Sequence, residues 1–160
     1  MMLAEFDLTV DYGQIFVLVS SRARPVLRWT DEHVAQGFAW SPTAVSFGVP
    51  DHDGRCLVQV TVTPKVSIAS QALWAVRVPF DALGDPLTIG SVAADHEVNV
   101  PAGKYSLVFE ALPGDTAKDH DYTFVFKLKF CTEPHPDFEI LKQGRELNTN
   151  RVLRKDADYQ

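Results

Sequence analysis

A mainly β fold, an antiparallel sandwich of the jelly-roll type, is the architecture that this 160-residue sequence predicts. Most of the chain divides into short segments in which apolar and polar residues alternate, which is the period of a strand with one buried face. Clusters of Gly, Pro, Asp and Asn separate these segments, as they do in sandwiches and barrels. Only one stretch in the first 136 residues has the start and stop signals of a helix.

The first half of the chain gives five of the expected strands. Residues 6–11 place Phe6, Leu8 and Val10 on one face, and Tyr12-Gly13 then makes a turn into the apolar run 15–19. Residues 44–49 end at the turn cluster Pro50-Asp51-His52-Asp53-Gly54. Residues 56–62 alternate with period two. Residues 73–80 put Trp74 in register with three apolar residues, so we expect it in the core.

The second half supplies the remaining strands. Residues 87–92 and 97–100 are short, and Pro101-Ala102-Gly103 forms the next turn. Residues 104–112 and 122–130 are longer, and each alternates aromatic or aliphatic side chains with polar or smaller ones. Eight or nine strands of this kind favour sheets with one packed face and one solvated face.

A short helix is expected over residues 30–37. Thr30 can cap its start, Asp31 and Glu32 suit the first turn, and Gly37 can adopt the left-handed conformation that ends a helix. The aromatic and apolar residues around it would pack it against a sheet, or in part form an exposed anchor for a partner. They are Trp29, Val34, Phe38 and Trp40.

The pattern changes near the C-terminus. Pro134 and Pro136 interrupt the last alternating segment, so we divide the chain into a β-sandwich domain, 1–136, and a C-terminal extension, 137–160. Residues 137–145 could form a short helix that ends at Gly144. We expect residues 147–160 to be a mobile tail, because no hydrophobic period is present there.

Charge limits the classes of partner. The formal net charge is −6, and the stretches 29–54 and 78–103 contain four acidic residues each and no Lys or Arg. Such surfaces repel nucleic acid and attract basic partners. No apolar run reaches the ~20 residues that span a bilayer. Residues 1–7 lack the features of a signal peptide, and two cysteines make no disulfide framework, so we expect a reducing, cytoplasmic setting.

The motifs of the common enzyme classes are missing from the sequence. It contains no phosphate-binding glycine loop, no nucleophile elbow and no zinc-binding pair of histidines on a helix. Four of the five histidines lie beside acids, but neighbouring residues on a strand point to opposite faces, and turns explain the Asp residues equally well. We therefore expect no catalytic residues, no metal and no cofactor. A disulfide between Cys56 and Cys131 is left open.

Three segments of the sequence resemble the competence protein J family, the inhibitors of a DNA-entry nuclease in competent bacteria. The most specific is Trp29-Thr30-Asp31-Glu32, which leads to Gly37-Phe38 and then to residues 44–47. The second consists of residues 76–80 and 87–92, and the third of residues 100–107 and 111–113. Together these segments cover roughly residues 5–130, and the C-terminal extension lies outside the resemblance.

The resemblance implies a small protein that binds a nuclease and blocks its DNA-cleaving site. A nuclease grips phosphates with a basic surface, so an acidic inhibitor without catalytic groups fits this role. From charge and position in loops, we predict the partner-binding residues to be Asp31, Glu32, Asp51, Asp53, Asp115, Asp119 and Asp121. The alternative is a noncatalytic β-sandwich module that binds carbohydrate, lipid or another small ligand. An enzyme is the third reading.

Overall fold

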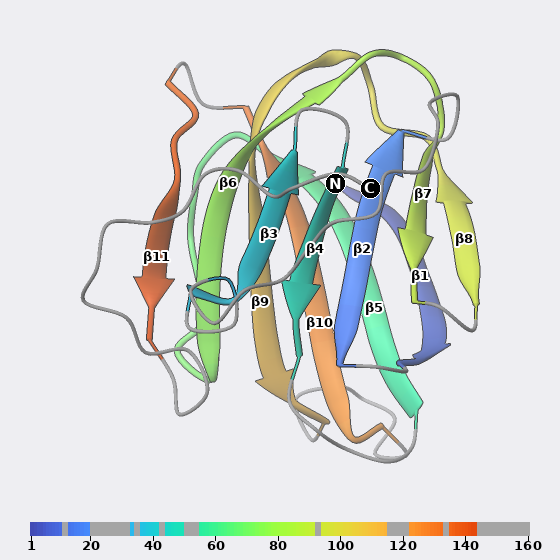
Figure 1. The fold of residues 1–160 in the computed structure, drawn as a ribbon, viewed down its shortest axis with the longest axis vertical. Helices are drawn as coiled ribbons and strands as arrows, with labels where there is room; N and C mark the ends of the chain where they lie inside the picture. The colour runs from blue at the N-terminus through green and yellow to red at the C-terminus, as the bar shows by residue number, and fades with distance from the viewer. Residues whose placement is uncertain are drawn as a thin grey trace.

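The computed structural model describes residues 1–10, 13–19, 33, 36–41, 44–49, 55–91, 94–114, 122–132 and 135–143. Within them the chain forms strands that assemble into two sheets (Figure 1). Sheet A has the order β1-β5-β10-β9-β6-β11, and sheet B has the order β3-β4-β2-β7-β8. The strands are β1 Met2–Thr9, β2 Gln14–Val19, β3 Phe38–Ser41, β4 Ala44–Gly48, β5 Arg55–Thr63, β6 Trp74–Ala82, β7 Leu87–Gly90, β8 Asp95–Val98, β9 Gly103–Pro113, β10 Phe124–Cys131 and β11 Glu139–Lys142.

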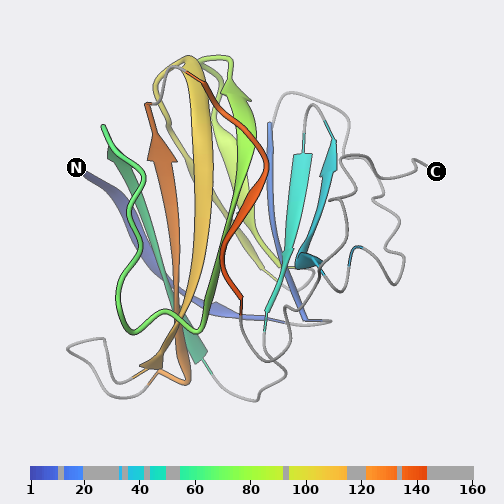
Figure 2. The same ribbon diagram turned by 90° about the vertical axis from the view of Figure 1, so that its left-hand side faces the viewer.

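The two sheets lie face to face as the layers of a sandwich (Figure 2). One core cluster fills the space between them, and both sheets contribute the alternate apolar residues of their strands. Aromatic rings at its centre join the layers: Phe47 of β4 stacks on Phe109 of β9 with ring centroids 4.8 Å apart, and Phe109 lies 5.7 Å from Phe126 of β10. The mainly β sandwich predicted from the alternation is therefore confirmed, and Trp74 lies in the core as expected.

One pair of strands departs from the antiparallel expectation. β5 and β10 are neighbours in sheet A and run parallel, with Cys56 opposite Phe124 and Thr63 opposite Cys131. Every other pair of neighbouring strands is antiparallel. Parallel neighbours need a long crossover connection. Here residues 64–123, which include strands β6 to β9, connect β5 to β10. Sequence periodicity does not reveal which strands pair.

The end of the predicted helix is present in the structure. His33 and Gln36 are helical, and the amide of Gly37 donates a hydrogen bond to the carbonyl of His33 at 2.9 Å. Gly37 has φ of 86°, which is the left-handed stop that the sequence predicted. Thr30, Asp31 and Glu32 lie outside the described residues. Phe38 and Trp40, which we expected to follow the helix as packing residues, form the edge strand β3 beside β4.

The short helix expected at 137–145 is wrong for the residues that the structure describes there. Residues 139–142 form strand β11, which pairs with β6, and Phe138 and Ile140 pack against the main core. Backbone pairing with β6 and burial of these two side chains outweigh the weak local preference for a helix. The sheet therefore continues past residue 136, into the segment assigned to the extension. Residues 144–160, including the predicted tail, lie outside the described residues.

Candidate functional site

None of the predicted partner-binding residues lies among the described residues, which hold only the residues that flank them. Asp31 and Glu32 precede His33, Asp51 and Asp53 fall between Val49 and Arg55, and the other three fall between Gly114 and Tyr122. The site is therefore built from these flanking residues. The predicted residues are Asp31, Glu32, Asp51, Asp53, Asp115, Asp119 and Asp121.

The starts of β5 and β10 lie side by side, because the two strands run parallel. The amide of Thr123 donates a hydrogen bond to the carbonyl of Arg55 at 2.8 Å, and the amide of Gly114 donates to the carbonyl of Thr123 at 3.1 Å. The end of β9 and the starts of β5 and β10 thus meet. Arg55, which follows the stretch 50–54, therefore lies close to Gly114 and Thr123, which flank the stretch 115–121.

Sheet B brings the other flanking residues to the same end. The amide of Gly48 donates a hydrogen bond to the carbonyl of Gly37 at 2.9 Å, and the amide of Val49 donates to the carbonyl of Gly13 at 2.9 Å. The hydroxyl of Ser91, after β7, donates to the carbonyl of Thr9 at 2.9 Å and ties sheet B to β1. We call this end of the sandwich the loop end, and it is the lower end in Figure 1. It is defined by residues 9, 13, 37, 48, 49, 55, 91, 95, 114, 122 and 123.

A polar cluster holds the start of β5 against β1 at the loop end. The guanidinium of Arg55 pairs with the carboxylate of Asp7 at 3.0 Å and lies over the ring of Tyr122, 5.2 Å from its centroid. The hydroxyl of Tyr122 donates a hydrogen bond to the same carboxylate. Arg55 and Asp7 are each about half exposed, so their ion pair adds at most about 1 kcal/mol. The cluster joins β1 and the start of β5 to the residues that precede β10.

The charges on the described strands are divided unequally between the sheets. The strands of sheet B contain no Lys or Arg, and their acidic residues are the exposed Asp95 and Glu97 of the edge strand β8. The strands of sheet A contain six Lys or Arg and five Asp or Glu. Asp95 lies at the loop end, opposite Gly90. The sequence placed Asp95 in a stretch without basic residues, but it did not show that β7 and β8 turn at this end.

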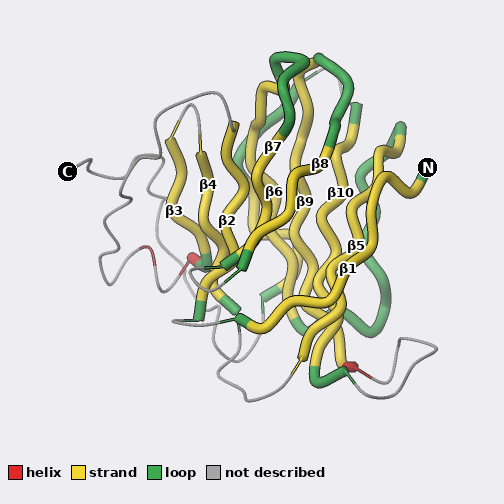
Figure 3. Tube along the Cα trace, turned by 90° about the vertical axis from the view of Figure 1, so that its right-hand side faces the viewer, coloured by secondary structure: helices red, strands yellow, loops and turns green. Residues whose placement is uncertain are grey.

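Strands β1 and β8 lie on the same side of the sandwich (Figure 3). His96 stacks on Phe6 of β1 with ring centroids 4.1 Å apart, so β8 contacts the edge of sheet A. His33 is fully buried. Among the described residues, no three His, Cys, Asp or Glu side chains come together as they would around a metal ion. Within that part of the chain, no helix is long and apolar enough to span a membrane.

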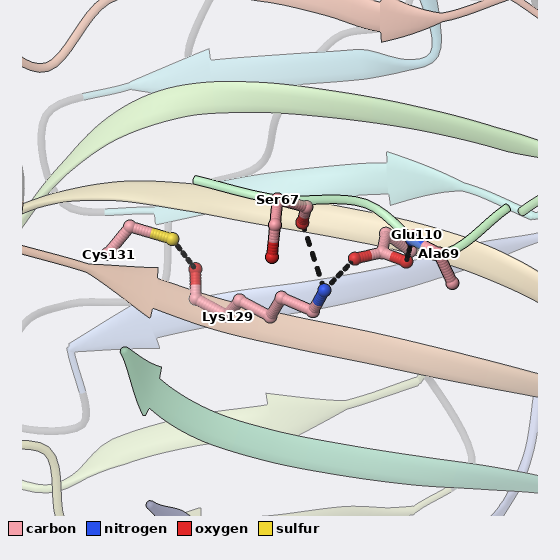
Figure 4. Close-up of polar contacts among 5 residues, drawn as sticks. All are labelled: Ser67, Ala69, Glu110, Lys129 and Cys131. Atoms are coloured by element: carbon pink, nitrogen blue, oxygen red, sulfur yellow. Dashed lines mark hydrogen bonds and ion pairs between the residues drawn. The ribbon is translucent and has the colours of Figure 1, made fainter. Parts of the chain in front are cut away.

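A buried ion pair that the sequence did not predict lies on the outer face of sheet A (Figure 4). Glu110 of β9 is fully buried and pairs with Lys129 of β10. The other carboxylate oxygen of Glu110 accepts a hydrogen bond from the amide of Ala69 at 3.0 Å, and Lys129 Nζ donates to the carbonyl of Ser67 at 2.9 Å. Residues 67–69 therefore lie across the sheet, held by two charged side chains.

Through these contacts, Glu110 and Lys129 hold residues 67–69 against sheet A. Both charged groups bind each other and the backbone of residues 67–69. Alternation along 104–112 placed Glu110 on an outward face, where we expected solvent. Its burial results from a loop that connects two other strands, and residues 64–73 carry no local signal for such packing.

The two cysteines are free, and both are buried. Cys56 lies in the core cluster between the sheets. Burial raises the pKa of the Cys56 thiol from 9.0 to about 11, although a hydrogen bond with the backbone of Phe124 opposes the shift. A thiol with this pKa is protonated near neutral pH, so it is a poor nucleophile. The disulfide left open by the sequence is absent, and Cys56 acts as a small apolar residue.

We predict that Glu110→Ala lowers the free energy of unfolding by about 3–5 kcal/mol, because it leaves Lys129 and the amide of Ala69 without their buried partner. The matched control is Glu139→Ala, whose carboxylate pairs with Arg77 but is itself 52% exposed, so its loss should cost only about 1 kcal/mol. Urea denaturation of both variants checks this. Equal losses in the two variants would contradict a special role for the buried pair.

The raised pKa of Cys56 predicts a loss of stability at alkaline pH. Between pH 9 and about 11 the unfolded chain releases the thiol proton while the folded chain keeps it, so the free energy of unfolding falls as pH rises. The loss approaches about 1.4 kcal/mol per pH unit. Urea denaturation from pH 8 to 10.5 should show this extra fall in the wild type and not in Cys56→Ala. Parallel pH curves for the two proteins would refute it.

Comparison with known proteins places the chain in a family. A family model described as competence protein J (ComJ) matches residues 7–131. The DNA-entry nuclease inhibitor of Bacillus subtilis (strain 168) is 24% identical over 120 residues, which cover 74% of this chain and 89% of the relative.

A solved structure agrees with the fold. It is the crystal structure of ComJ from Bacillus subtilis, described as an inhibitor of the DNA-degrading activity of NucA. It has a TM-score of 0.65 and 22% identity, and the match covers 81% of this chain and 97% of that one. The family match runs from within β1 to the end of β10, and this chain belongs to the competence protein J (ComJ) family.

Proposed function

We propose that this protein inhibits a bacterial DNA nuclease by binding its basic active face and blocking access to DNA. Membership of the ComJ family carries the proposal, because the relatives described above are named as inhibitors of a DNA-degrading nuclease. A noncatalytic role is part of it. Two observations support it: Glu110 and Lys129 are engaged in hydrogen bonds with the protein's own backbone, and the thiol of Cys56 stays protonated at neutral pH.

Charge supports the same mechanism. A nuclease presents Lys and Arg to the phosphates of DNA, and a partner of opposite charge reaches that surface faster than a neutral one. This chain has a formal net charge of −6, and the described strands of sheet B bear Asp95 and Glu97 without any Lys or Arg. The chain therefore resembles DNA in charge and would itself bind DNA poorly.

We place the contact surface at the loop end. The proposed contact residues are Asp31, Glu32, Asp51, Asp53, Asp115, Asp119 and Asp121, and the residues that flank them are joined there by backbone hydrogen bonds. Asp95, an exposed carboxylate at the same end, is a further candidate. The two free thiols support a reducing, cytoplasmic setting as part of this proposal.

The first experiment measures DNA degradation by a NucA homologue from the same organism, with and without the purified protein. We expect complete inhibition at saturating inhibitor and a stable complex of the two proteins in a pull-down. Continued cleavage at saturating inhibitor would refute the proposal. A mobility assay with DNA alone should show no binding by the inhibitor.

Removing acidic residues from the proposed surface should slow association. Asp51→Ala/Asp53→Ala and Asp119→Ala/Asp121→Ala should each lower the association rate constant by up to about tenfold and weaken its dependence on salt, because they reduce steering toward a basic face. Stopped-flow measurements at several ionic strengths check both effects. The matched control is Asp81→Ala/Asp85→Ala, which removes the same charge at and just after the C-terminal end of β6, away from the loop end. If it slows association as much, net charge is responsible, and the loop end is not the contact surface.

A further inference from the structure

Strand β11 is an addition to the part of the chain that matches the family. The family match ends at residue 131, and β11 covers residues 139–142. It pairs antiparallel with β6 and forms the outer edge of sheet A, on the far side of the sheet from β1. Figure 1 shows it at the left, beside β6. Without β11, the edge of sheet A on this side would be β6.

β6 has the properties of an edge strand that would pair with another chain if it were exposed. It is nine residues long, with the sequence WAVRVPFDA, and most of its side chains are buried. An exposed, long and apolar edge strand offers unpaired backbone groups to any other strand, and another copy of the same edge is always present in solution. Proteins therefore shorten, charge, twist or cover such edges.

Two features, strand β11 and Pro79, protect different parts of this edge. Over residues 75–77, β11 lies alongside β6, with Glu139 opposite Arg77 and Ile140 opposite Val76. Further along, Pro79 has no amide hydrogen to donate, and its carbonyl accepts a hydrogen bond from Trp40 Nε1 of β3 at 2.8 Å. Residues 75–77, which Pro79 does not protect, are therefore the part of β6 that β11 covers.

Side chains anchor the covering segment at several points. Phe138 packs edge-on against Trp40 with ring centroids 5.1 Å apart, and stacks 6.0 Å from Phe38, so it closes the gap between the edge of sheet B and the edge of sheet A. Ile140 packs against the core. Glu139 pairs with Arg77 at 3.1 Å, and Lys142 Nζ donates to the carbonyl of Ser70 at 3.3 Å.

These anchors are of unequal strength. The carboxylate of Glu139 is 52% exposed and the contact of Lys142 is exposed, so solvent screens both polar contacts and each adds only about 1 kcal/mol. The strand pairing is short and its register shifts between Ile140 and Lys142. The segment therefore depends mainly on Phe138 and Ile140, and removing these two side chains should release it while the rest of the sandwich remains folded.

We propose that residues 135–142 are an edge-covering segment, and that they keep the β6 edge from pairing with the β6 edge of a second copy of this chain. When the segment is released, two copies join through antiparallel pairing of their β6 strands about a two-fold axis. This role is separate from nuclease inhibition and does not rest on it.

The test uses the full chain with Phe138→Asp/Ile140→Asp, which places two carboxylates where apolar side chains pack. Hydrogen exchange at residues 75–77 measures release of the edge, and sedimentation velocity over a range of concentrations measures association. We expect faster exchange at 75–77 and a rise in average mass toward roughly twice that of the wild type as concentration increases. The matched control, His135→Asp/Gln143→Asp, puts two carboxylates at exposed positions, one at the start of this segment and one just after its end, and should behave as the wild type.

A synthetic peptide with the sequence of residues 135–143 should lower the mass of the released variant again, and a peptide with Ala in place of Phe138 should do so less well. If exchange at 75–77 rises while the mass stays at that of the wild type, the proposal is overturned. Unchanged exchange would overturn it too, because β11 would then not protect the edge. Should circular dichroism show that the double variant is unfolded, Phe138→Ala provides the same readouts with a smaller released fraction.

Discussion

Parallel pairing between β5 and β10 is the constraint on which the arrangement of this protein depends. It places the starts of both strands at one end of sheet A, where Thr123 and Arg55 share a hydrogen bond and Tyr122 contacts the Arg55–Asp7 pair (Figure 1). If the two neighbours ran antiparallel, their starts would lie at opposite ends of the sheet, about eight residues or ~26 Å apart. The residues that flank the acidic stretches 50–54 and 115–121 would then be separated, and a single contact surface built from both would not form.

The two sheets then take different roles. The described strands of sheet A carry mixed charges, several of which pair with each other, and a loop covers part of the outer face through Glu110 and Lys129 (Figure 4). The described strands of sheet B carry only Asp95 and Glu97. An inhibitor that approaches a basic nuclease would benefit from this division, because Arg55, Arg77 and Lys129 pair with carboxylates in sheet A while β8 presents Asp95 and Glu97.

Strand positions could be read from the sequence because each buried face repeats with period two, and the alternation in β5 and β10 survives in the structure almost unchanged. Two strands were missed for a common reason. β3 and β11 have only four residues each, too few for a clear alternation; β3 pairs with the adjacent β4 directly after the helix signal, and β11 pairs with β6, far earlier in the chain. The burial of Glu110 escaped prediction because a loop from elsewhere in the chain covers it. The sequence predicted acidic loops as the partner-binding site, and the structure adds that their flanking residues share one end. The contact residues themselves stay a prediction.

The most direct measurement is hydrogen exchange of this protein, alone and in complex with a NucA homologue from the same organism. If the loop end binds the basic face, protection on complex formation will concentrate at residues 50–54 and 115–121 and at the starts of β5 and β10. Exchange at β6 and β11, on another side of the sandwich, will be unchanged. Protection confined to β6 and β11, with none at the loop end, would contradict the proposed surface and would identify the edge of sheet A as the contact.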